Sequence, residues 1–506
     1  MRPSLKEPCG SNSVVKFNQQ PNILQIFFMK SQVHKIQRLF VDVEFNGTES
    51  DGMNLQRSAS DLYDHFIMPA LEKALNQYVP IKDYLTLERL DIDAGTLQLD
   101  RLESNLSERI IHALEKSLQE LSVSTSPLHS RETDTVTFKT EGESISNAFI
   151  FFLKKGTLPW SFHLPSGSNF EESVYKFLKE PKRFGSTPEL IRREVVDTLT
   201  SATARKRLVH QFTPVFLETL LELISAEDKK VLEGILQLFR SSEFLSLDAK
   251  QLQPLLWEHA FASLASGSPL AEQTILTKIR SALSDSVFRN SSLAKQIQSV
   301  LFDEKKTDTS TNKLSASLLV EQNVQMTDDS DSQSPVEHPD AKAGIYIGLA
   351  GLVLLHPFLP QLFRALGIAD DETLLQPNKA LYLLFFLATG ECIAPEYELV
   401  LSKILCNISL DTVVESDIIL SVEEQQEAEA LLSAVIRHWE ILQNTGIEGL
   451  RETFLKRSGK LSQKSDGEWL LQVESKSYDL LLEQLPWGIS MIKLPWMSQM
   501  LRVEWV

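Results

Sequence analysis

The stretch that decides the fold of this chain reads LPWGISMIKLPW at residues 485–496 and is followed by LRVEW at residues 501–505. Proline fixes its backbone φ and lacks a hydrogen-bond donor, so each Leu-Pro-Trp triplet predicts a turn. Each tryptophan adds a large apolar face and an indole N–H that needs an acceptor. The pattern predicts either an internal lid on the C-terminal domain or a partner-docking surface. Its candidate residues are Leu485, Pro486, Trp487, Ile489, Met491, Lys493, Pro495, Trp496 and Trp505.

The sequence just before these turns predicts a helical domain at residues 341–506 with a short C-terminal β element. Apolar residues recur at helical spacing from Leu432 to Leu442 and alternate from Trp469 to Val473 and again from Leu501 to Trp505. These patterns predict one helix and two strands that pair with each other. The apolar run at residues 344–355 ends at His356 and Pro357, short of the roughly 20 residues a spanning helix needs. We expect a buried helix there, in which Gly348 and Gly351 let another helix approach closely.

At the other end, residues 30–121 predict a small α+β unit in the order strand, helix, strand, helix. Residues 39–45 and 90–93 alternate between apolar and acidic side chains, as half-buried strands do. Apolar residues from Ala59 to Ala74 mark a helix that Pro69 should distort. Asn105 and Glu108 resemble a capping signal for a second helix that reaches residue 121. A helix between two strands implies parallel pairing.

The centre of the chain predicts short helices between polar linkers. Residues 144–302 read as a helical region with helix ends at Pro159, Pro181, Pro214 and Pro254. Residues 122–143 are rich in Ser and Thr and read as a linker. Residues 303–340 are polar and acidic with almost no aromatic residues, so they cannot bury enough surface to fold and should be flexible.

The overall prediction is a mainly α, multi-domain chain with flexible linkers. Residues 1–29 read as a loose N-terminal extension, and Met29 is a candidate alternative translation start.

Composition excludes several classes of function. The net charge of the 506-residue chain is −18, whereas a nucleic-acid binder carries a basic footprint. Three cysteines, Cys9, Cys392 and Cys406, cannot build a disulfide framework and fit a reducing cytoplasm. We therefore expect no nucleic-acid partner and no membrane span.

Three common motifs of catalytic sites are absent from the sequence. The chain has no phosphate-binding loop, no nucleophile elbow and no zinc-binding helix, and its ten histidines are scattered. We therefore predict no catalytic residues, no cofactor and no metal. One conceivable exception is a carboxylate/thiol site in which Glu391, Glu396 and Glu398 surround Cys392, although no histidine lies nearby to activate the thiol.

Basic residues are concentrated at one place in the sequence. The residues there are Arg192, Arg193, Arg205, Lys206 and Arg207. This concentration predicts a solvated helix face, with contact to an acidic partner as the alternative.

Several long strings resemble the family of contractile injection system tape measure proteins, from phage-tail-like contractile particles of bacteria. The N-terminal strings are HKIQRLFVDVEF (34–45), LYDHFIMPALEKAL (62–75) and LERLDIDAGTLQLDRLE (87–103). The C-terminal strings are GLAGLVLLHPFLPQLFRALG (348–367), LATGECIAPEYELVLSKILC (387–406), HWEILQNTGIEGLRETFLKRSGKL (438–461) and the tryptophan-rich tail. Weaker similarity lies in FLKKGTLPW (152–160) and RKRLVHQF (205–212).

The resemblance implies a non-enzymatic structural component that helps to set tube and sheath length. Its implied partners are tube, baseplate or spike subunits. Its implied location is the cytoplasm during assembly and then the extracellular particle. The alternative is an assembly adaptor or chaperone that binds those subunits without setting length. An enzyme or toxin cargo is a third hypothesis, which only the Glu391/Cys392 cluster favours.

Overall fold

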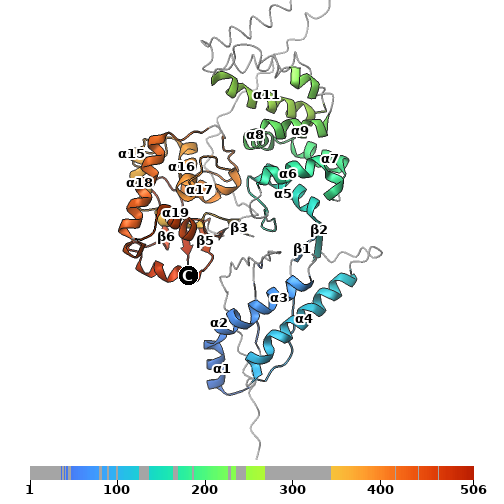
Figure 1. The fold of residues 1–506 in the computed structure, drawn as a ribbon, viewed down its shortest axis with the longest axis vertical. Coiled ribbons are helices and arrows are strands. Elements are labelled where there is room, and N and C mark those ends of the chain that lie inside the picture. The colour runs from blue at the N-terminus through green and yellow to red at the C-terminus, as the bar shows by residue number, and fades with distance from the viewer. Residues whose placement is uncertain are drawn as a thin grey trace, which may run out of the picture.

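The computed structural model describes residues 47–78, 83–87, 90–98, 101–124, 136–162, 169–184, 187–225, 229–234, 247–267 and 344–505, apart from residues 416, 417, 443, 465 and 466, together with single residues at 36, 39, 41–43 and 164. Most of these residues are helical, and short strands form two small sheets (Figure 1). The mainly α class with a C-terminal β element is therefore confirmed. The predictions for residues 1–29 and 303–340 lie outside the described residues.

The N-terminal part is a helix pair with a small core of its own. Its elements are α1 (Glu49–Arg57), α2 (Ala59–Leu62), the π-helix η1 (Tyr63–Ile67), α3 (Met68–Tyr78) and α4 (Leu102–Ser124). Helix α3 contributes Met68, Leu71 and Ala74 to the core, and α4 contributes Leu114 and Leu118. This spacing of three to four residues places them on one face of each helix.

The predicted distortion at Pro69 takes the form of η1. A proline ring collides with the carbonyl four residues earlier, here that of His65, and cannot donate to it. The π-turn at Tyr63–Ile67 widens the helix at this place and accommodates the proline. The predicted cap at Asn105 is wrong, because α4 already begins at Leu102.

The predicted βαβα unit is not confirmed. Residues 39, 41–43 and 90–98 lie in no strand. Leu90 and Ile92 are half-buried against the N-terminal core, so the alternation is real. However, the Asp93 carboxylate accepts a hydrogen bond from the Gly95 N–H at 2.8 Å, a local turn that competes with strand pairing.

The strand pair that forms in this region involves other residues and is antiparallel. Strand β1 (Asp83–Leu87) pairs with β2 (Val136–Thr140) in antiparallel register, with Leu85 opposite Phe138. Parallel pairing was expected between residues 39–45 and 90–93, whereas this antiparallel pair joins two segments for which no strand was predicted. Strand β2 and the first turn of the next helix also fall within residues 122–143, which the sequence predicted to be a linker.

A second group of helices follows β2. Its elements are α5 (Glu141–Lys155), α6 (Phe170–Lys179), the 3₁₀ helix η3 (Pro181–Phe184), α7 (Pro188–Thr198), α8 (Ala202–Gln211), α9 (Pro214–Ile224) and α11 (Leu247–Ala265). Thr140 caps α5 in a capping box with Glu143. We call residues 141–267 the central helices.

The prolines of the central helices act as predicted, with one exception. Pro181 begins η3 directly after α6 ends, and Pro214 opens α9 in its first turn. Pro254 lies inside α11, so the predicted helix end there is wrong. The buried residues after it, Trp257 and Phe261 among them, show how much packing offsets the cost of an internal proline.

The C-terminal part, residues 344–505, combines short helices with a five-stranded sheet. Its helices are η6 (Ala350–Leu355), α15 (Leu359–Ala365), α16 (Pro377–Thr389), η7 (Glu396–Glu398), α17 (Val400–Leu405), α18 (Val422–His438), η8 (Glu440–Leu442), α19 (Ile447–Leu450), η9 (Arg451–Leu455) and η10 (Ser477–Gln484). Its strands are β3 (Ile345–Ile347), β4 (Gly459–Gln463), β5 (Trp469–Val473), β6 (Met491–Ile492) and β7 (Leu501–Glu504). The strand order is β3-β4-β5-β7-β6.

Several predictions for this part are confirmed. Strands β5 and β7 form where the sequence alternates, and they pair with each other in parallel. The predicted helix is α18, which ends at His438, just before the buried Trp439.

A separate observation concerns membranes: among the described helices, none is both long and apolar enough to cross a bilayer.

The run at residues 344–355 is buried, but it is not one helix. It forms the edge strand β3 and then the 3₁₀ helix η6. A side chain on Gly351 would overlap the backbone carbonyl of Phe454 in η9, so close approach at Gly351 is confirmed. Gly348 has open space around it, so the same prediction is wrong there.

Replacing Gly351 with alanine is expected to destabilise the C-terminal part by about 2 kcal/mol or more, because the added methyl group must push η9 away. Gly348→Ala is the matched control and should change stability by less than about 0.5 kcal/mol. Urea denaturation of the full chain measures both variants. Equal midpoints for the two would show that η6 and η9 are not in backbone contact.

Candidate functional site

The first candidate region, the tryptophan block at residues 485–505, packs into the C-terminal part. Trp496 is 7% exposed and stacks on Phe363 with ring centroids 5.3 Å apart. Its Nε1–H donates to the carbonyl of Leu405 at 2.8 Å. The second Leu-Pro-Trp triplet therefore places both the ring and the N–H of its tryptophan in the interior of the C-terminal part.

The other two indoles also have internal partners. Trp487 is half-buried, lies edge-on to Phe358, and donates to the carbonyl of Leu354 at 3.0 Å. Trp505 donates to the Asp479 carboxylate at 3.2 Å, and the Arg457 guanidinium lies over its ring. Each indole N–H thus finds the acceptor that its burial requires.

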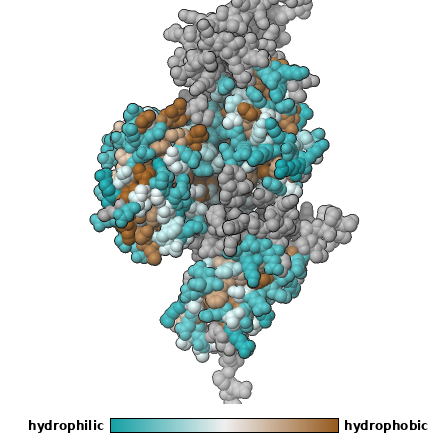
Figure 2. Space-filling view, viewed as in Figure 1, coloured by the Kyte–Doolittle hydropathy of each residue, from teal (hydrophilic) through white to brown (hydrophobic). Residues whose placement is uncertain are grey.

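The remaining residues of the block divide by exposure. Leu485 and Ile489 pack half-buried against the C-terminal core. The exposed members are Pro486, Met491, Lys493 and Pro495. Figure 2 shows hydrophobic patches on the visible face of the C-terminal part.

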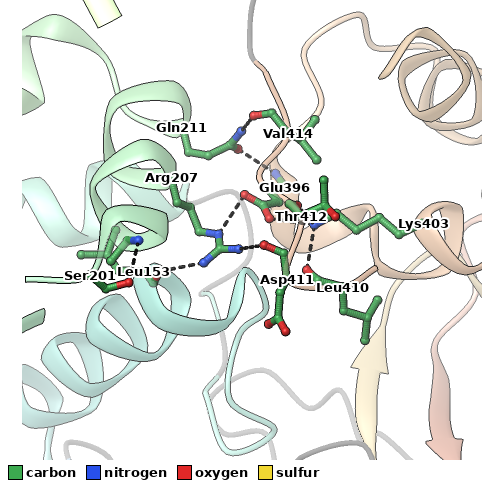
Figure 3. A network of polar contacts seen from close by, with 11 residues as sticks. Leu153, Ser201, Arg207, Gln211, Glu396, Lys403, Leu410, Asp411, Thr412 and Val414 are labelled. Carbon is green, nitrogen blue, oxygen red and sulfur yellow. Dashed lines mark hydrogen bonds and ion pairs between the residues drawn. The ribbon is translucent and has the colours of Figure 1, made fainter. Parts of the chain in front are cut away.

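The second candidate region is a buried polar network between the central helices and the C-terminal part (Figure 3). Its centre is Arg207 of α8, whose side chain is fully buried. The guanidinium Nε donates to Glu396 Oε2 at 3.0 Å, and Nη1 donates to the Leu153 carbonyl at 2.7 Å. Nη2 donates to the Asp411 carbonyl at 3.0 Å. The three contacts connect α5, α8 and the C-terminal part.

Glu396 joins two cations. It lies in η7, its side chain is fully buried, and its Oε1 accepts a hydrogen bond from Lys403 Nζ at 2.7 Å. Lys403 Nζ also donates to the carbonyls of Leu410 and Thr412 at 3.0 and 2.7 Å. Burial lowers the pKa of Lys403, and the Glu396 carboxylate opposes that effect. Each of the three N–H groups of the Lys403 ammonium therefore has a hydrogen-bond acceptor in the protein.

Neutral contacts extend the network. Gln211 of α8 accepts a hydrogen bond from the Glu396 backbone N–H at 2.8 Å and donates to the Val414 carbonyl at 2.8 Å. Gly156 ends α5 with φ of 73°, and a side chain there would lie 2.5 Å from Glu396 Oε1. Glycine at this position therefore serves both the helix end and the close approach of the carboxylate.

An aromatic contact lies beside the charges. The Tyr397 ring lies edge-on to Phe152 and to Phe170, at centroid distances of 6.0 and 5.6 Å. Burial raises the pKa of the Tyr397 hydroxyl. Tyr397 is thus the side chain through which the C-terminal part reaches the core of the central helices.

These positions correct two expectations. The carboxylate/thiol cluster does not assemble, because Glu396 is buried on Arg207 while Cys392 is exposed. Burial and the nearby Glu391 raise the pKa of Glu398. The basic concentration is a solvated face only in part: Arg192, Arg193 and Lys206 are exposed, but Arg207 is not.

Sequence signals for the network existed. Ala204, Arg207, Leu208 and Gln211 follow the spacing of one helix face, and Ala204 and Leu208 are apolar. Lys403 interrupts the apolar run of α17. Both were missed because charged residues are normally on the surface.

The network holds parts of the chain together. Its charges are paired with one another or with carbonyls, and it contains no activated nucleophile. In the described part of the chain, no group of three or more metal-ligating side chains comes together.

The network also brings together three strings of the family resemblance that are far apart in the sequence. Leu153 and Gly156 come from residues 152–160, Arg207 and Gln211 from residues 205–212, and Glu396 and Lys403 from residues 387–406. No curated protein and no solved structure matches the chain. The family model of the contractile injection system tape measure protein matches residues 33–505, nearly the entire sequence, and the chain therefore belongs to that family.

Proposed function

We propose that this protein helps to set the length of the tube and sheath of a contractile particle, through residues that lie between its folded parts. Family membership makes the chain a structural component of such a particle. The finer role, its contacts with tube, baseplate or spike subunits, and its passage from the cytoplasm into the particle belong to the proposal. So do the domain limits 30–121, 144–302 and 341–506.

The observation that carries the proposal is the shortness of the described helices. A single helix of all 506 residues would reach about 760 Å, whereas α4, with 23 residues, reaches only about 35 Å. The central helices and the C-terminal part each surround a core of their own. No described element can act as a long rod, so length information would have to reside in the residues that connect the folded parts.

Deleting about half of residues 303–340 is expected to shorten the particles. The removed residues, roughly 19, span at most about 60 to 70 Å when extended, which bounds the change. Electron microscopy of particles assembled with the variant measures tube and sheath length. Replacing the same residues with a Gly/Ser sequence of equal length is the matched control and should leave particle length unchanged.

Unchanged particle length after the deletion would contradict the length-setting role. It would favour the adaptor alternative, in which the chain binds tube, baseplate or spike subunits without measuring. For that alternative the exposed residues of the tryptophan block, such as Met491 and Lys493, are the candidate contacts.

A further inference from the structure

We propose that the contact centred on Arg207 and Glu396 is a latch that opens as a unit, separating the central helices from the C-terminal part while both stay folded. The latch residues are Arg207, Gln211, Glu396, Tyr397, Asp411 and Val414. This inference rests on the proposed function, because it describes how a folded chain becomes able to measure length.

The two sides of the latch have independent cores. Buried apolar side chains of the central helices, such as Phe149 and Phe216, form one cluster. Those of the C-terminal part, such as Phe363 and Leu432, form another. Among the described residues of the C-terminal part, Tyr397 is the one whose half-buried ring packs against the first cluster. Separation would expose this ring and leave both clusters intact.

The chemistry of the latch favours reversible opening. The contacts that cross it are an ion pair and three further hydrogen bonds, which involve the carbonyls of Asp411 and Val414 and the backbone N–H of Glu396. Burying charges carries a large desolvation cost, which their attraction only partly offsets. On opening, Arg207 and Glu396 regain water, so separation costs less than for an apolar contact of the same size. Polar contacts between parts of one chain are the kind that permit relative motion.

Opening also has a geometric consequence for the proposed function. Gly267 and Gly344 lie on opposite sides of the latch, and roughly 75 residues connect them. A closed latch fixes the distance between the two folded parts, whatever the number of residues between them. Once the latch opens, that connection can span up to about 250 Å. The distance between the two folded parts can therefore depend on the number of residues that connect them only when the latch is open.

Hydrogen exchange of the full-length protein tests the latch. We expect the Glu396 amide, read from peptides covering residues 394–399, to exchange faster than the amides of α18 and α5. Gln211→Ala removes two hydrogen bonds of the latch and should accelerate that exchange about tenfold, with no change in α18 or α5. The matched control is Gln425→Ala, which removes one hydrogen bond inside the C-terminal part and should leave residues 394–399 unchanged.

Two results would overturn the latch. One is exchange of the Glu396 amide at the same rate as α18 and α5 in the unmodified protein, which would mean that the contact breaks only on global unfolding. The other is equal acceleration of all three regions by Gln211→Ala. Particle length is measured independently, by electron microscopy of the linker deletion, so a failure of the latch can be told apart from a failure of the length-setting role.

Discussion

Replacing Glu396 with glutamine is expected to destabilise the closed arrangement by about 3–5 kcal/mol, because the change removes the carboxylate that forms ion pairs with two buried cations. Arg207 and Lys403 are both almost completely buried, and Glu396 forms an ion pair with each of them. Glutamine has nearly the same size, so the effect isolates charge from packing. The result would be early separation of the central helices from the C-terminal part.

Urea denaturation followed by circular dichroism, with small-angle scattering to detect separation, measures this effect in the full-length protein. Glu391→Gln is the control, because Glu391 is exposed and belongs to the same loop. Adding Lys403→Met to the Glu396→Gln variant should recover part of the loss, since one unpaired cation is removed. If Glu396→Gln were as stable and as compact as the control, the buried ion pair would not hold the two parts together.

Trp496→Ala is the second substitution with a large expected effect, a loss of about 3–5 kcal/mol in the free energy of unfolding of the C-terminal part. The change removes the ring that stacks on Phe363 and leaves the Leu405 carbonyl without its donor. Trp496→Phe keeps a ring but not the N–H, and should cost about 1–3 kcal/mol. The ordering of these two variants separates packing from hydrogen bonding.

Met491→Ala is the control from the same block, because Met491 is 69% exposed and should tolerate the change within about 0.5 kcal/mol. Circular dichroism during urea denaturation is the suitable measurement, since removal of a tryptophan alters the fluorescence signal. Equal stability of Trp496→Ala and Met491→Ala would contradict the packing of Trp496 in the C-terminal core.

The sequence predicts those helices and strands whose apolar residues repeat regularly over enough positions to distinguish a helix from a strand. Strand β5 alternates over five residues, and the apolar face of α18 repeats at helical spacing from Ala428 to Ile436. Strand β4, Gly459–Gln463, was missed because its sequence GKLSQ has a single large apolar residue, and its pairing with β3 and β5 decides its conformation. At residues 90–93 the alternation reflects burial against α3 and α4 and not a strand.

The candidate site was only partly predictable for a related reason. The tryptophan block was evident because proline and tryptophan have distinctive local effects, although the sequence left open whether the rings face inward. The buried network depends on pairing between residues 189 positions apart, Arg207 and Glu396. Each of these residues alone looks like an ordinary surface charge, and only the fold shows that they neutralise each other.

Particle length as a function of the number of residues between 303 and 340 is the most direct test of the length-setting role. A series of deletions and insertions in this segment, imaged by electron microscopy, should give lengths that rise steadily with residue number. The slope should not exceed about 3.6 Å per residue. Particles of one length across the whole series would contradict a measuring role for this chain.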